Sequence, residues 1–193
     1  MMVSKVEVVV LGLLSEEPLH GYGLLERFRA RGMGHWVEAG KASVYQCLRR
    51  LEQRGLVSGK AEESAEGPDR RVFTITKTGR GRLREGIRER FAETTPSEAG
   101  LAIAFAQVLP ADEVRRSIAD RERTLRGMLE GAGSQRYRES GDGPVSGAIW
   151  NAMLDRQQIL IKAELAWLAR YRAEGRGSRK DRSSSRVAGQ PYD

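Results

Sequence analysis

The segment from Lys41 to Gly79 constrains the fold more than any other part of the chain; it reads KASVYQCLRRLEQRGLVSGKAEESAEGPDRRVFTITKTG. Its first part carries apolar residues at helical spacing and ends at Gly55, a residue type that favours helix C-termini. Two short alternating segments follow, separated by a turn that contains Gly67-Pro68. A short basic helix followed by a basic hairpin is the order in which a protein can place one helix in the DNA major groove and a β-wing beside it.

Helices are predicted on both sides of this segment. Ser4 is expected to cap a first helix over residues 5–16, and a second helix starts near His20 and stops near Gly32. On the second helix, four side chains are expected to point toward the core: Tyr22, Leu24, Leu25 and Phe28. The third helix covers about 41–54, and Thr76 caps a fourth over about 77–91. Three helices, a hairpin and a fourth helix predict a winged helix-turn-helix domain over residues 1–92.

The distribution of charge indicates different partners for the two halves of the chain. Residues 1–90 carry 17 Lys+Arg against 12 Asp+Glu, whereas residues 91–172 carry 11 of each. A basic first half suggests contact with a polyanion, and a neutral second half suggests contact with protein. A generally arginine-rich composition would give the same excess, and charge alone leaves that reading open.

Two further observations bear on location. No apolar run approaches the ~20 residues that a membrane span requires, and the apolar run 8–14 continues directly into patterned sequence. We therefore predict a core helix there, and neither a signal peptide nor a membrane contact. A single cysteine permits no intrachain disulfide, which agrees with a reducing cytoplasm. The sequence predicts a cytoplasmic protein.

The second half is predicted to be helical and to dimerise. A short apolar helix (101–108) precedes a helix from Asp112, in which Arg121 occupies one slot of an otherwise apolar heptad-like series. A last helix over about 145–172 carries a wide apolar stripe, and its predicted dimerisation residues are Trp150, Leu154, Ile161, Leu165 and Leu168. One partner helix cannot cover so wide a stripe, so a second subunit is expected. The fold class is therefore mainly α with a small β-hairpin: a helical dimerisation domain (93–173) follows the winged domain, and a disordered basic tail (174–193) ends the chain.

The third helix is amphipathic in a way that suits DNA reading. Val44, Leu48 and Leu51 share the inward side, while small and polar side chains occupy the opposite side. Glutamine can pair with adenine, arginine can pair with guanine or a phosphate, and lysine contacts phosphates. The candidate DNA-binding residues, including those of the hairpin, are Lys41, Ala42, Ser43, Tyr45, Gln46, Arg49, Arg50, Lys60, Arg70 and Arg71. A solvated basic helix face is the alternative interpretation.

Three motifs in this order resemble the PadR family of transcriptional regulators. They are VLGLLSEEPLHGYGLLERF, KASVYQCLRRLEQRGLVS and DRRVFTITKTGRGRL, within residues 8–83. Lys41-Ala42 depart from the family pattern, since many members carry glycine or Pro-Gly before the serine. The resemblance implies a homodimer held by C-terminal helices on a palindromic operator. It also implies a repressor that a small hydrophobic or aromatic effector releases.

The remaining residues offer no competing chemistry. His20, His35 and Cys47 do not have metal-ligand spacing, and no catalytic triad, P-loop or dinucleotide motif is present, so neither an enzyme nor a cofactor is predicted. Cys47 is interpreted as a buried small hydrophobe, with a redox switch as the alternative. Trp36, Trp150 and Trp167 are candidates for an effector pocket, with interface packing as the alternative. The rival to DNA binding is a winged-helix module that binds protein instead.

Overall fold

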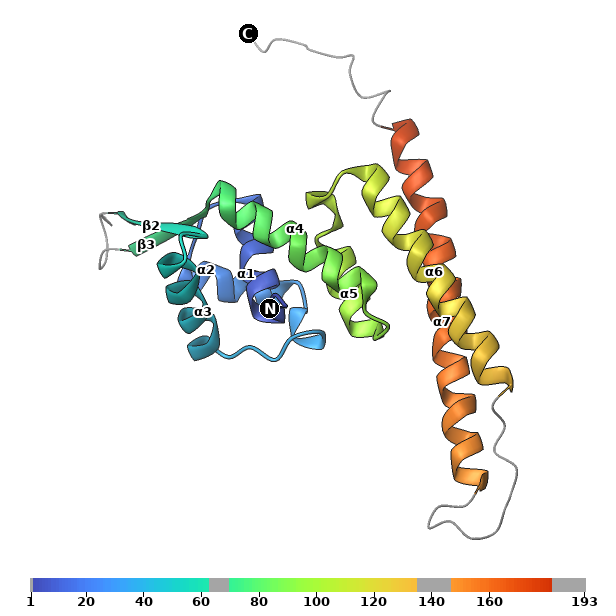
Figure 1. Ribbon diagram of the computed structural model, residues 1–193. Coiled ribbons are helices and arrows are strands. Elements are labelled where there is room, and N and C mark those ends of the chain that lie inside the picture. The colour runs from blue at the N-terminus through green and yellow to red at the C-terminus, as the bar shows by residue number, and fades with distance from the viewer. Residues whose placement is uncertain (1, 63–69, 135–146, 182–193) are drawn as a thin grey trace. The chain divides into compact units, whose positions relative to one another are not determined.

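The computed structural model describes residues 2–62, 70–134 and 147–181, which form two compact units, Met1–Ser117 and Ile118–Asp193 (Figure 1). The first unit holds the winged helix-turn-helix elements. Its N-terminal helix α1 (Lys5–Glu16) begins at a capping box, in which the Ser4 hydroxyl accepts from the Glu7 amide and the Glu7 carboxylate accepts from the Ser4 amide. Eight of its residues are buried, so α1 is the central helix of this unit, as its apolar sequence predicted.

The start of α2 and the end of α3 lie where a capping side chain and a glycine predict them. His20 Nδ1 accepts from the Gly23 amide and so caps α2 (Gly21–Ala30). A 3-10 turn (Met33–His35) then leads to α3 (Lys41–Gln53), and Gly55 follows α3 with a φ of 65°. That left-handed backbone is one that glycine adopts without the steric cost of a Cβ.

The sheet has one more strand than the predicted hairpin. Strands β2 (Val57–Glu62) and β3 (Arg70–Ile75) pair antiparallel, and β1 (Leu19–His20) pairs with the other side of β3, giving the order β1-β3-β2. The prediction of a hairpin alone was incomplete, because two residues cannot show the alternation that identifies a strand. β1 attaches the start of α2 to the sheet.

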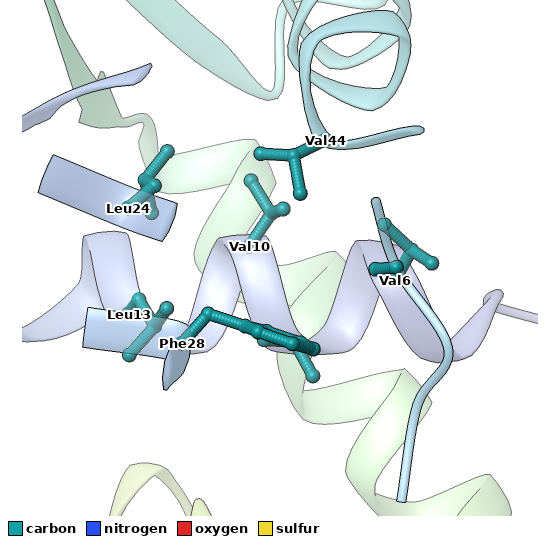
Figure 2. A pocket seen from close by; sticks show the side chains of 8 residues that line it. Val6, Val10, Leu13, Leu24, Phe28 and Val44 are labelled. Carbon is teal, nitrogen blue, oxygen red and sulfur yellow. The ribbon is translucent and has the colours of Figure 1, made fainter. Parts of the chain in front are cut away.

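The core of the first unit lies where α1, α2 and α3 converge (Figure 2). Val10 and Leu13 of α1 face Leu24 and Phe28 of α2 and Val44 of α3, around a cavity of about 10 Å³. A space of that size holds at most one water-sized sphere, and its apolar lining offers such a sphere no polar partner. Tyr22 was expected to join this core but is 55% exposed; it lies about 60° around α2 from Leu25, at the edge of the buried apolar arc.

Helices α4 (Lys77–Ala92) and α5 (Pro96–Ala104) complete the first unit. The Thr76 hydroxyl caps α4 by accepting from the Gly79 amide, as predicted. The buried Arg90 side chain of α4 donates to the Val3 carbonyl and to Glu98 of α5, and it thereby fastens both the N-terminal segment and α5 to α4. A 3-10 turn (Ala106–Val108) connects α5 to the next helix, and the first compact unit runs to Ser117.

The second unit is a pair of long helices. Most of α6 (Ala111–Ser134) lies beside α7 (Gly147–Asp181) in Figure 1. Ile118 and Leu125 of α6 and Ile161 and Leu168 of α7 are buried. Among them lies a buried ion pair, in which the Arg121 guanidinium donates to the Glu164 carboxylate at 2.6 Å. The structure has α7 as a helix to Asp181, whereas the sequence predicted a disordered tail from residue 174; residues 182–193 lie outside the described part.

Candidate nucleic-acid interface

The two sides of α3 differ as the sequence predicted. Val44, Cys47, Leu48 and Leu51 are buried against the first unit. The exposed residues of the helix are Lys41, Ala42, Ser43, Gln46, Arg49, Arg50 and Gln53. The structure therefore places six of the seven candidate DNA-binding residues of this helix at the surface. This exposed face can present amide, hydroxyl and guanidinium groups to base edges and phosphates.

Tyr45, the seventh candidate on α3, has a structural role as well. Its side chain is half-buried, and a Cβ placed on Gly21 would lie 2.6 Å from its ring. The ring therefore lies against the backbone at the start of α2, and only glycine leaves room for that approach. This contact fixes α3 against α2.

The start of α3 carries no side-chain cap. Gly40 is its N-cap residue and makes no side-chain hydrogen bond, whereas α1, α2 and α4 are capped by Ser4, His20 and Thr76. Backbone N–H groups in a first turn have no helical acceptor, and together with the helix dipole they attract anions. With Lys41 exposed beside them, the first turn of α3 suits a phosphate group.

Ion pairs fix α3 on its two flanks. Arg54, which follows the helix, donates to Glu7 of α1 at 2.6 Å. On the other flank, the Glu52 carboxylate accepts from Arg71 of β3 at 2.6 Å and from the Gly59 amide of β2 at 3.1 Å. These contacts hold α3 in one orientation relative to α1 and to the two strands of the wing.

The wing (β2 and β3) contributes its candidate residues unequally. Lys60 on β2 is exposed, as a phosphate contact requires. Arg71 is also exposed but is paired with Glu52, and its guanidinium lies 5.8 Å from the centre of the Phe73 ring. The position of the Arg70 side chain and the turn over residues 63–69 lie outside the described residues.

The structure adds residues that the sequence did not assign to the DNA interface. An open cleft of about 740 Å³ lies between the start of α2, the flank of α3 and β3. Candidate residues Tyr45, Arg49 and Arg71 line it together with His20, Tyr22, Glu26 and Glu52. The exposed Tyr22 could have been found from its position on α2, since it lies outside the arc of the buried residues.

Cys47 lies on the buried side of α3, which confirms the prediction of a small buried side chain. Burial raises the pKa of its thiol to about 11, and the nearby Glu7 carboxylate acts in the same direction. Because the thiolate is the reactive form, this thiol is poorly reactive near neutral pH. The structure favours a packing role for Cys47 over a redox role.

The predicted dimerisation residues do not share one environment. Ile161 and Leu168 are buried within the second unit, Leu154 and Leu165 are half-buried, and Trp150 is 45% exposed. A different set on α7 is exposed and apolar, namely Ile149, Met153, Leu160 and Trp167. Their spacing of four, seven and seven residues places them in one stripe about 100° away from Ile161 and Leu168.

The three tryptophans divide between the two units. Trp36 is half-buried in the first unit, where its indole lies against α5 so closely that a Cβ on Gly100 would be 2.6 Å from its Nε1 atom. Trp150 and Trp167 lie on α7, and the ring of Trp167 stacks on Tyr171 with 5.3 Å between centroids. A shared effector pocket for the three rings stays a prediction.

Within residues 2–62, 70–134 and 147–181, no group of three or more His, Cys, Asp or Glu side chains is arranged to hold a metal ion. In the same ranges, no helix combines the length and the hydropathy that a bilayer span needs.

Sequence comparison relates the first unit to known regulators. Residues 10–85 match the model of the PadR-like family of transcriptional regulators. A probable transcriptional regulator of Mycobacterium tuberculosis is 31% identical over 87 residues, which are 45% of this chain and 46% of that protein. The chain thus spans about half the length of the curated relative that it matches.

Two solved structures are among those to which the chain is similar. A PadR-like regulator from Bacillus cereus is 28% identical over 43% of this chain and 78% of that chain, with a TM-score of 0.38. The PadR protein of Bacillus subtilis, solved in complex with operator DNA, is 20% identical over 87% of this chain and 97% of that chain, with a TM-score of 0.39.

Proposed function

Because residues 10–85 match the model of the PadR-like family of transcriptional regulators, we propose that this protein is a regulator that binds DNA sequence-specifically as a homodimer. The observation that carries the proposal is the exposed face of α3, where Gln46, Arg49 and Arg50 lie opposite a fully buried apolar side. We assign α3 to the major groove, with its uncapped first turn at a phosphate. Lys60 of the wing contacts the flanking backbone. This activity places the protein in the cytoplasm.

Two variants separate base reading from backbone contact. Arg49→Ala is expected to abolish the preference for one sequence at the position that Arg49 reads, at a cost of about 1–3 kcal/mol on the preferred duplex. Lys60→Ala is expected to weaken binding to all sequences alike. It should also reduce the magnitude of the slope of log K against the logarithm of the salt concentration by about one. The measurement is selection of duplexes from a random pool, followed by titration at several salt concentrations.

The same titration tests the rival function. If the wild-type chain selects no sequence and shifts no duplex at low salt, it is a winged-helix module that binds protein, and the proposal fails. If both variants lose affinity equally on selected and random duplexes, the assignment of base reading to Arg49 is wrong.

We assign the dimer contact to the exposed stripe of α7, formed by Ile149, Met153, Leu160 and Trp167. Side chains spaced by seven residues pack against a second helix along its length. Two α3 helices related by a twofold axis would enter major grooves about 34 Å apart, so the operator should be palindromic.

Leu160→Glu tests this stripe. It would bury an unpaired carboxylate at the contact, so the dissociation constant of the dimer should rise at least roughly a hundredfold. The control is Ala169→Glu, which adds the same charge at an exposed position on the other side of the same helix. Sedimentation equilibrium measures both variants, and equal effects of the two would contradict the assignment.

In more detail, we propose that the protein is a repressor and that a small aromatic effector releases it from DNA. The exposed ring of Trp150 supports it, because an aromatic side chain at a surface suits flat apolar ligands. Footprinting of upstream DNA with and without a panel of aromatic compounds tests it. Protection that no compound changes would remove the effector from the proposal.

A further inference from the structure

The Glu52 carboxylate of α3 binds both strands of the wing. One oxygen, Oε1, accepts from Arg71 Nη2 on β3 at 2.6 Å and from the Gly59 amide on β2 at 3.1 Å. β2 is an edge strand in the order β1-β3-β2, so a bond from its amide to Glu52 satisfies a donor on the open edge of the sheet. A single side chain of α3 therefore fixes the two strands together.

Gly59 shows that the strands are built around this contact. A Cβ at Gly59 would lie 2.4 Å from Arg71 Nε, 2.8 Å from Glu52 Oε1 and 3.0 Å from the Phe73 ring. A side chain there would displace the Arg71 guanidinium or the Glu52 carboxylate, because the guanidinium crosses the strand at this position. Glycine inside a strand marks such a close approach, and here it admits the ion pair.

The charges around Glu52 explain why its ion pair with Arg71 affects DNA binding. Lys41, Arg49 and Arg50 are exposed on α3, and an unpaired carboxylate beside them would repel a DNA phosphate. Arg71 neutralises Glu52 and is itself held by it, at a distance of 5.8 Å from the Phe73 ring. The pair is exposed enough to contribute little to global stability, with side chains 58% and 28% accessible for Arg71 and Glu52. The ion pair therefore acts on the orientation of the wing relative to α3.

We propose that Glu52 is a positioning residue for DNA recognition: it sets the angle of the wing relative to α3 through Gly59 and Arg71, without touching DNA. This inference rests on the proposed function, since it takes DNA as the ligand. It also changes the role expected for Arg71, which becomes a structural partner of Glu52, while Lys60 remains the exposed contact residue of the described wing.

The first arm of the test uses the full-length protein without DNA. Glu52→Ala should make the Gly59 amide exchange its hydrogen at least roughly tenfold faster. Glu52→Gln should restore most of the protection, because the amide oxygen of glutamine still accepts from Gly59 and Arg71. The charge-matched control is Glu62→Gln at the end of the same strand, which should leave Gly59 unchanged. Unchanged exchange in Glu52→Ala would overturn the contact itself.

The second arm uses duplexes that the wild-type protein selects from a random pool. Glu52→Ala should bind them roughly tenfold more weakly and lose hydroxyl-radical protection at the flanks, while the centre stays protected by α3. The double variant, in which Glu52 and Arg71 are both alanine, should match Glu52→Ala, because both proteins lack the coupling and neither leaves the Glu52 carboxylate unpaired. Full flank protection in Glu52→Ala, or a further tenfold loss in the double variant, would overturn the positioning role. If the wild-type protein itself binds no duplex, the proposed function fails, and the exchange of Gly59 still decides whether the contact exists.

Discussion

Replacing Glu164 with alanine is expected to lower the free energy of unfolding of the second unit by about 3–5 kcal/mol. Glu164 is the partner of Arg121, whose side chain is 2% accessible between α6 and α7. Both the Nε and Nη2 atoms of Arg121 lie 2.6 Å from the same carboxylate oxygen. Without Glu164, the buried guanidinium loses the charge-assisted hydrogen bonds that this carboxylate accepts, and that is what makes the loss large.

Urea unfolding followed by tryptophan fluorescence measures this effect. Trp150 and Trp167 lie on α7, so a Trp36→Phe background restricts the signal to the second unit. The control is Asp120→Ala, which breaks the exposed pair with Arg123 on α6 and should change stability by less than about 1 kcal/mol. Replacing both Arg121 and Glu164 with leucine should recover most of the loss, because no charge is then left buried. A small effect of Glu164→Ala would show that this ion pair contributes little to the stability of the second unit.

Gly79→Ala is expected to destabilise the first unit by about 3 kcal/mol or more, at the upper end of the cost of overpacking. A Cβ at this position would lie 2.0 Å from the Leu56 carbonyl oxygen and 2.9 Å from Ile75 Cγ1. The Leu56 carbonyl cannot easily move away, since it accepts hydrogen bonds from both the amide and the hydroxyl of Thr76 at 3.1 Å. The clash would separate the start of α4 from the segment that leads into β2.

Gly81→Ala is the matched control, two residues further along α4. No atom lies within 4 Å of a Cβ at Gly81, so alanine there should stabilise the helix by about 0.5–1 kcal/mol. Thermal unfolding followed by Trp36 fluorescence, with Trp150 and Trp167 replaced by phenylalanine, measures both variants. Similar behaviour of the two alanines would show that the backbone around Leu56 yields to the new methyl group.

Local signals predicted most helix boundaries of the winged domain. Ser4 and Thr76 cap α1 and α4 at the predicted positions, and Gly55 ends the region of α3 with the positive φ that its residue type allows. These features depend on hydrogen bonds and torsion angles within a few residues, so the sequence contains them directly. The two-residue strand β1 has no such signal, because it forms only through its pairing with β3.

The candidate interface was predictable as a surface but not as a set of contacts. The spacing of Val44, Leu48 and Leu51 fixed which side of α3 is buried, and therefore which side is exposed. The engagement of Arg71 by Glu52 was not predictable, because the two residues are 19 positions apart on different elements. Periodicity within one element says which face is polar, but not which partner another element brings to it.

By itself, the sequence determined the type and limits of most elements of the winged domain, and the exposed polar face of α3. Tertiary structure alone decided three pairings: Glu52 with the two strands of the wing, Arg90 with Val3 and Glu98, and Arg121 with Glu164. The reason is physical. Capping and amphipathicity are set by neighbours within one helix or strand, whereas a buried or bridging charge is defined by the group that another segment brings within about 3 Å of it.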